Sequence, residues 1–358
     1  MLKSLNLTNF RSYREIKLQI DQPLIVILGP NAVGKTNLLE SVYVASTTHS
    51  FRDRDREIIH YGEDFYRVEA GFDDYVHEVR FVTEGNHYRK STLVNSVKRP
   101  LNSVVGINPV VIFEPNDMNL LTGPPDLRRR HLDTVLSQIY PEYMAAISTY
   151  RRILKQRNSL IHQAKINSRL SNLDDQLFVW NLQILDPATK IIRARRQMIE
   201  GTAPLLADYY NKIAATRTRA VTFSYSPSLP DNKDKYLGAL KNNLAKDIHA
   251  GFTTAGPHRD DFSVEFDGRN VIQAASRGEL RTVILALKLA QMDYFEEQLA
   301  KRPILLLDDV FSELDKSRRE FLVGSIDGQQ TFITTTDLDK SLKHDYQLID
   351  LSGVGHVA

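Results

Sequence analysis

The chain has 358 residues, 42% hydrophobic and 25% charged, and its 46 basic and 44 acidic residues leave a net charge of +2. Its length allows roughly two or three domains, each with its own core. The absence of cysteine excludes disulfides and thiolate metal sites, and no apolar run approaches the roughly 20 residues that cross a bilayer. Because the N-terminus also lacks the pattern of a secretion signal, we expect a cytoplasmic protein with no membrane partner.

Charge is distributed unevenly along the chain. Residues 126–220 contain 16 Lys and Arg against 8 Asp and Glu, a net charge of +8, whereas the rest of the chain carries −6. A basic segment of this kind suits contact with a phosphate backbone. A solvated helical arm would show the same charge, so charge alone leaves both interpretations open.

The first third of the chain reads as strands with a single helix. The apolar run 24–28 predicts a buried strand, and Leu38, Leu39 and Val42 lie on one face of a helix that begins near Lys35. From about 65 to 97 apolar and polar residues alternate between turn signals, which indicates an antiparallel β lobe.

A helical region follows the strong breaker at 123–125, Gly-Pro-Pro. Helical spacing runs to Ile139, pauses at Pro141 and resumes, and a second helical stretch at about 173–214 is expected to be divided by Pro187 and Pro204. These segments predict an inserted helical arm at 123–221 within a head formed by 1–122 and 222–358.

Strand signals return in the last third. Asp267-Gly268 predicts a two-residue hairpin turn, a long helix is expected from about 278 to 298, and buried strands are expected at 304–307 and 331–334.

Residues 29–36 match the phosphate-binding pattern G-x-x-x-x-G-K-[ST] between a predicted strand and a predicted helix. In such a loop, backbone N–H groups cradle phosphates at a helix N-terminus, Lys35 reaches the β- and γ-phosphate oxygens, and the Thr36 hydroxyl faces Mg²⁺. The pattern predicts ATP as ligand, and the residues that would bind it are Gly29, Pro30, Asn31, Ala32, Val33, Gly34, Lys35 and Thr36.

The strand at 304–307 delivers Asp308 and Asp309 to the carboxyl edge of its sheet. We expect Asp308 to hold Mg²⁺ and Asp309 to polarise the attacking water, so that Lys35, Asp308 and Asp309 are the predicted catalytic residues. Many ATPases have Glu at the second position, and the shorter Asp predicts slow hydrolysis.

Ser276-Arg277-Gly278-Glu279 opens the long helix. One interpretation is a capping box, because Ser276 and Glu279 have the S-x-x-E spacing. The other is a signature that contacts the γ-phosphate of ATP held by another subunit. The two are compatible, and the position about 25 residues before the acidic pair favours the second.

Together these motifs resemble the ABC-type ATPases and, among them, the RecF family. Further segments carry the resemblance: Asn9-Phe10-Arg11, Ser50-Phe51-Arg52, Arg128-Arg129-Arg130, Leu154-Lys155-Gln156-Arg157-Asn158, Ala255-Gly256-Pro257-His258-Arg259-Asp260-Asp261 and Ser312-Glu313-Leu314-Asp315. The resemblance implies an α/β head with a P-loop core and an antiparallel β lobe, and it adds Arg11 to the nucleotide-binding residues.

For function, the resemblance implies a recombination mediator in DNA repair. Such a protein forms a homodimer on ATP, binds gapped DNA or single-strand/duplex junctions, and works with RecR in loading RecA. The alternatives are a transporter nucleotide-binding subunit and a structural chromosome ATPase of the SMC type. Two departures from the ABC pattern stand out: Thr336 occupies the place of a switch histidine, and no glutamine follows the strand at 110–113.

Candidate DNA contacts come from the basic residues of the loop near 50 and of the arm. Solvated surfaces explain the same residues, so both interpretations stay open. We expect His258 to be structural or close to DNA rather than a metal ligand, and Trp180 to belong to the arm core. The candidate DNA contacts are Arg52, Arg54, Arg128, Arg129, Arg193, Arg195 and Arg196.

Overall fold

The computed structural model describes residues 1–85, 87–166, 173–214, 219–338 and 345–352. The chain divides into two compact units, a first unit of 1–117 with 284–358 and a second unit of 118–283. The division falls within helix α10 (Arg277–Leu299).

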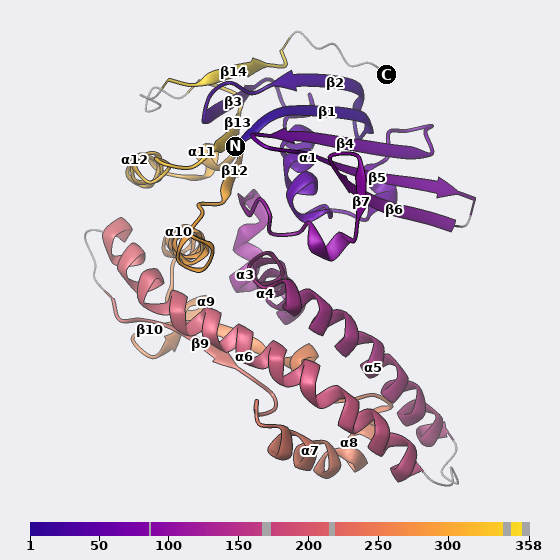
Figure 1. Cartoon of the computed structure of the whole chain (residues 1–358). Coiled ribbons are helices and arrows are strands. Elements are labelled where there is room, and N and C mark those ends of the chain that lie inside the picture. The colour runs from indigo at the N-terminus through magenta and orange to yellow at the C-terminus, as the bar shows by residue number, and fades with distance from the viewer. Residues whose placement is uncertain (86, 167–172, 215–218, 339–344, 353–358) are drawn as a thin grey trace. The chain divides into compact units, whose positions relative to one another are not determined.

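In the described part of the first unit, an antiparallel sheet forms in the order β2-β1-β4-β5-β6-β7. Its strands 65–99 confirm the predicted β lobe, to which the two N-terminal strands also belong (Figure 1). The strands are β1 (Leu2–Phe10), β2 (Tyr13–Gln19), β4 (Phe65–Phe72), β5 (Val76–Glu84), β6 (His87–Val94) and β7 (Val97–Arg99).

A parallel sheet in the order β14-β3-β13-β12-β8 is the second layer of this unit. Three of its strands are almost entirely buried apolar runs, as expected of a parallel sheet covered on both faces. The strands are β3 (Leu24–Leu28), β8 (Val110–Phe113), β12 (Ile304–Asp308), β13 (Thr331–Thr335) and β14 (Gln347–Asp350).

Helix α1 (Lys35–Thr47) contacts strands of both sheets, and its buried apolar residues join one apolar cluster with them. Shorter helices complete the unit around this core: α2 (Asp55–Ile58), η1 (Leu101–Ser103), η2 (Pro115–Met118), α11 (Val310–Glu313) and α12 (Lys316–Gly324). The core therefore fixes α1 against the parallel sheet whose carboxyl edge carries the acidic pair.

The second unit is built on two long helices that lie side by side, α5 (Pro141–Ile166) and α6 (Leu173–Ala214) (Figure 1). A small antiparallel sheet, ordered β11-β10-β9, packs on α6 through β9, with the predicted turn at Asp267-Gly268 between β10 and β11. The other elements are α3 (Asn119–Thr122), α4 (Pro125–Ile139), β9 (Val221–Ser226), α7 (Lys233–Asn242), α8 (Leu244–Ala250), η3 (Pro257–Arg259), β10 (Asp261–Phe266), β11 (Arg269–Asn270) and α9 (Val271–Ala274).

Two expectations differ from the structure here. Pro187 and Pro204 lie inside α6 and do not divide it, because the buried face of the helix runs from Leu177 to Ile213 and its packing outweighs the roughly 3 kcal/mol that an interior proline costs. Residues 222–283, expected in the head, cluster with the arm, because β9 packs on α6 and pairs with β10. No helix of the described residues is long and apolar enough to span a membrane.

Candidate nucleotide-binding site

The loop between β3 and α1 has the geometry that its glycines predict. Gly34 is the N-cap of α1 with φ 110°, a conformation that L side chains rarely adopt. A Cβ at this position would lie 2.8 Å from the hydroxyl oxygen of Tyr13 and 2.9 Å from that of Ser12. Only glycine therefore leaves the loop free to present its N–H groups at the start of the helix.

Lys35 turns back into this loop. Its ammonium donates to the carbonyl oxygens of Gly29 at 2.8 Å and of Pro30 at 2.9 Å, and the residue is 7% exposed. Burial lowers the pKa of Lys35, although Asp309 and Asp308 act in the opposite direction. A buried ammonium with two neutral acceptors is suited to exchange them for phosphate oxygens, which are charged.

Asp308 links the loop to the parallel sheet. Its Oδ1 accepts hydrogen bonds from the Thr36 hydroxyl at 2.8 Å and from the Thr334 hydroxyl at 2.9 Å. The Thr334 oxygen in turn accepts from the backbone N–H of Asp309 at 2.9 Å. The predicted partners Lys35, Thr36, Asp308 and Asp309 are thus brought together, and Thr334 is a member that the sequence reasoning missed.

The same geometry fits a magnesium ion. Thr36 Oγ1 and Asp308 Oδ1 are hard oxygen donors within 2.8 Å of each other, the kind of ligand that Mg²⁺ takes from protein. Across the described ranges no group of three or more His, Cys, Asp or Glu could hold a metal alone. The two oxygens of Thr36 and Asp308 are enough for magnesium, which uses few protein ligands and completes its shell with water and phosphate.

Glu114 is a further acidic group at this edge. Leu307 pairs with Phe113 in parallel register, so the residues that follow them, Asp308 and Glu114, lie at the same end of the sheet. Burial raises the pKa of Glu114 to about 7, and the negative charges of Asp117 and Asp308 add to that effect. Lys288 offsets part of it and is itself ion-paired with Asp117 at 2.6 Å. Glu114 directly follows β8, the strand after which the ABC pattern places a glutamine that this chain lacks.

Arg11 is held beside the loop by Glu40, which is fully buried on α1. Its guanidinium donates to both carboxylate oxygens of Glu40, at 2.9 and 2.7 Å, and to Asp53 at 2.6 Å. Its expected part in nucleotide binding remains a prediction. In the sequence, Glu40 ends the segment 34–40 that shares the family resemblance, but no role was assigned to it.

The signature residues lie in the second unit, at the start of α10. The Ser276 N–H donates to Glu279 Oε2 at 2.9 Å, and the Glu279 N–H donates to Ser276 Oγ at 3.3 Å, which confirms the capping box. Arg219 donates to the other Glu279 oxygen at 2.9 Å and fixes this carboxylate. Contact of the signature residues Ser276, Arg277, Gly278 and Glu279 with a nucleotide stays a prediction.

Several candidate DNA contacts are occupied within the protein. Arg195 is 2% exposed and binds Asp133 and the Pro257 carbonyl oxygen, both at 2.7 Å, so its guanidinium is already engaged within the protein, and its contact with DNA stays a prediction. Arg128 makes a two-pronged ion pair with Asp261 at 2.6 and 2.9 Å.

The other candidates differ in exposure. Arg196 pairs with Asp231 at 2.6 Å, and Arg52 pairs with Glu40. Arg129 is half-buried, whereas Arg54 and Arg193 are exposed. The exposure of each side chain therefore distinguishes arginines that are available for a DNA contact from those that are buried within the protein, a distinction that the sequence does not give.

His258 has a structural role, as expected. Its Nε2 lies 3.0 Å from the Thr253 carbonyl oxygen, which can only accept, so Nε2 carries the proton and Nδ1 accepts from the Tyr150 hydroxyl at 2.6 Å. Burial lowers the pKa of His258 to about 4, and the nearby arginines contribute. Trp180 is only half-buried on α6.

A P-loop at the carboxyl edge of a parallel sheet, an acidic pair on a neighbouring strand and a flanking antiparallel lobe define an ATPase head of the ABC type. The family model described as RecF/RecN/SMC N terminal domain matches residues 1–352. The DNA replication and repair protein RecF of Bacillus cereus (strain AH820) is 34% identical over 354 residues, covering 96% of this chain and 94% of that protein. The chain therefore belongs to the RecF/RecN/SMC family, and within it to RecF.

Two solved structures agree over almost the whole chain. The recombination mediator protein RecF-ATPrS in the RecFOR pathway has a TM-score of 0.87 at 29% identity and covers 98% of this chain and 96% of its own. RecF-ATP in the same pathway has a TM-score of 0.85 at 28% identity and covers 95% and 92%. These likenesses do not favour a transporter subunit or a structural chromosome ATPase.

Proposed function

We propose that this protein is an ATP-dependent recombination mediator that dimerises on ATP, binds gapped or junction DNA, and works with RecR in loading RecA. Support comes from relatives named DNA replication and repair protein RecF and from structures named recombination mediator protein RecF. The observation that carries the nucleotide part is the hydrogen bond from Thr36 to Asp308, which joins the phosphate loop to the acidic strand end.

The residues of the loop have separate tasks toward ATP. Its N–H groups and Lys35 bind phosphate oxygens, while Thr36 and Asp308 hold Mg²⁺. Magnesium, when bound with ATP, neutralises charge on the phosphates. Asp309 acts on the attacking water, and its side chain is one methylene shorter than glutamate. We therefore expect slow hydrolysis, which suits a timer for DNA release.

The signature completes the site from a second copy of the chain. Ser276 is exposed and caps α10, and the N-terminus of this helix carries a partial positive charge suited to a γ-phosphate. Nucleotide bound in one copy would then be closed by the signature of the other. Dimerisation would depend on ATP for this reason.

DNA binding is assigned to exposed basic residues in both units. Arg54 lies in the loop before α2, and Arg56 on that helix lies over the Tyr88 ring at 5.6 Å. Arg193 is exposed on α6. Basic side chains of this kind bind phosphates without reading sequence, which fits recognition of a DNA structure.

The test is a titration of gapped duplex DNA over a range of salt, with and without ATP. We expect the logarithm of the binding constant to fall linearly with log salt, and each of Arg54→Gln and Arg193→Gln to reduce the slope by roughly 1. Lys17→Gln, which removes an exposed charge paired with Glu15, is the matched control. Salt-independent binding, or no binding in either nucleotide state, would refute the DNA part of the proposal.

A further inference from the structure

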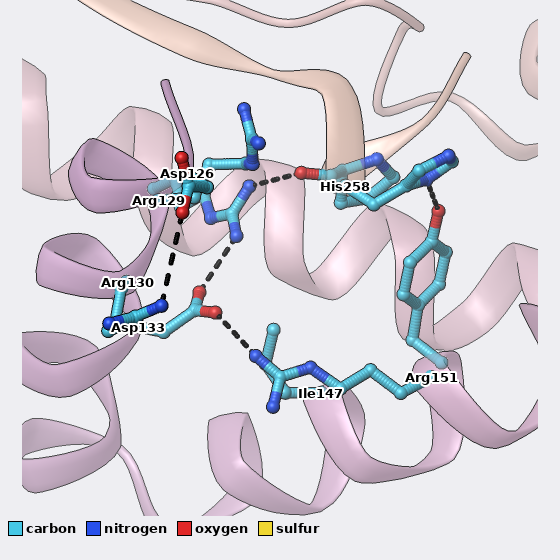
Figure 2. A pocket seen from close by; sticks show the side chains of 10 residues that line it. Asp126, Arg129, Arg130, Asp133, Ile147, Arg151 and His258 are labelled. Carbon is cyan, nitrogen blue, oxygen red and sulfur yellow. Dashed lines mark hydrogen bonds and ion pairs between the residues drawn. The ribbon is translucent and has the colours of Figure 1, made fainter. Parts of the chain in front are cut away.

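The second unit contains a basic pocket that the nucleotide site does not use. It is a cavity of about 210 Å³ among α4, α5, α6 and η3 (Figure 2). Its volume exceeds that of several water molecules, at roughly 30 Å³ each in the liquid. The charged side chains that line it are Arg129, Arg130, Arg151, Arg195, Asp126 and Asp133.

Positive charge exceeds negative charge in this lining. The single carboxylate of Asp133 pairs with two guanidiniums: its Oδ1 accepts a hydrogen bond from Arg195 at 2.7 Å, and its Oδ2 accepts one from Arg151 at 3.2 Å. Arg130 and Asp126 approach only to 3.9 Å, and both are exposed. Four arginines face two carboxylates, so the lining carries a net charge of +2.

Arg129 forms no ion pair shorter than 4.0 Å in the described part of the chain. Its Nη1 donates to the Asp260 carbonyl oxygen at 3.0 Å, a neutral acceptor. Burial lowers the pKa of Arg129, the neighbouring positive charges of Arg195 and Arg259 add to that effect, and the negative charges of Asp261 and Asp126 offset part of it. His258, at the pocket wall, is neutral near pH 7 and adds no charge of either sign.

We propose that this pocket binds a phosphate group, with Arg129 and Arg151 as the principal donors. A phosphate monoester carries a charge of about −1.5 to −2 near pH 7, which matches the lining, whereas a carboxylate would neutralise only half of it. Guanidinium forks match phosphate oxygens geometrically. The phosphate is either free in solution or a terminal phosphate of DNA, because an internal phosphodiester carries a single negative charge. The second source rests on the proposed function.

Binding of inorganic phosphate, measured by calorimetry with the P-loop saturated by ADP and Mg²⁺, tests this proposal. Arg129→Gln and, separately, Arg151→Gln should each weaken phosphate binding at least tenfold. Arg152→Gln removes an exposed arginine of the same helix that does not line the pocket and should leave the affinity unchanged. Arg151 is 69% exposed on its side chain, so its variant is expected to fold even if Arg129→Gln does not.

Two further arms identify the ligand. Competition by gapped duplex DNA that carries a 5′-phosphate at the gap would assign the site to DNA, and no competition would assign it to free phosphate; both support the pocket. Equal phosphate affinity in wild type and both variants, or acetate binding as tightly as phosphate, overturns it. DNA binding that survives while phosphate binding fails would refute the pocket alone, so the two proposals fail separately.

Discussion

At the scale of single residues, Thr334 organises the acidic end of the nucleotide site. Its hydroxyl donates to Asp308 and accepts from the Asp309 N–H, so it fixes both carboxylates. Thr334→Val keeps the shape and removes both hydrogen bonds. Because an unmade buried hydrogen bond costs about 1–3 kcal/mol, the Mg²⁺ concentration for half-maximal ATP hydrolysis should rise roughly tenfold.

Thr335→Val is the control for this substitution, because the Thr335 hydroxyl donates to the Asp337 carbonyl oxygen, just after the strand, and not to the acidic pair. Both variants should be measured by ATP hydrolysis over a Mg²⁺ titration. An unchanged Mg²⁺ requirement in Thr334→Val would contradict this role of Thr334.

Glu114 makes stability depend on pH. Its pKa in the folded state, about 7, lies above its ordinary value of 4.5, so the folded protein holds this proton more tightly than the unfolded chain does. The resulting stabilisation is full below the ordinary pKa and is lost as pH rises through the folded pKa. Without Mg²⁺, the free energy of unfolding should fall by about 1–3 kcal/mol as pH rises from the ordinary pKa to the folded pKa. Glu114→Gln should abolish this pH-dependent loss of stability.

Urea denaturation at about pH 5 and about pH 7.5 measures the effect of Glu114. Glu84→Gln, at an exposed glutamate of β5, should keep the wild-type pH dependence. If Glu114→Gln also keeps it, the assigned pKa shift is wrong.

Sequence could predict the residues that act through local spacing. Lys35 and Thr36 belong to a contiguous motif, and Asp308 ends a recognisable apolar strand. Thr334 and Glu114 reach the site through parallel pairing of β12 with β13 and β8, which joins residues far apart in the chain. No local pattern reports that register, so both were missed.

At the scale of elements, Arg157 joins three helices of the second unit. It is fully buried on α5 and donates to Asn181 of α6 at 2.8 Å and to Asp247 of α8 at 2.8 Å. Arg157→Met leaves the Asp247 carboxylate buried without its charge partner. The free energy of unfolding should fall by about 3–5 kcal/mol.

Chemical denaturation of Arg157→Met and of the double variant with Asp247→Asn tests this network. The double variant removes the unpaired charge and should recover part of the loss. Arg152→Gln, an exposed change on the same helix, should cost little. A single variant as stable as wild type would show that the ion pair does not hold these helices.

The boundaries of an element were predictable where the spacing of its apolar residues and the flanking Gly and Pro residues indicate the same limits. The strand at 24–28 and the helix from Lys35 were confirmed. The continuity of α6 through Pro187 was not predictable, because it depends on tertiary packing of a long buried face. Strand β14 was missed for a related reason, since alternating burial over four residues gains meaning only from its pairing with β3.

At the scale of the whole molecule, the motifs fall into two groups. The P-loop and the acidic pair lie in the first unit, and the signature lies in the second. The family resemblance indicated that a second copy supplies the signature, and this remains a proposal. Its distinctive consequence is that two different inactive chains can complement each other.

Mixing two variants tests the composite site most directly. Lys35→Ala disables the phosphate loop, and Ser276→Arg disables the signature without touching the loop. In a heterodimer of the two, one site has both defects and the other has none. An equimolar mixture should regain about a quarter of wild-type ATPase activity, because about half of randomly formed dimers are mixed and each has one intact site of two. A mixture as inactive as either variant alone, under conditions in which the wild type hydrolyses ATP as a dimer that exchanges subunits, would contradict the composite site.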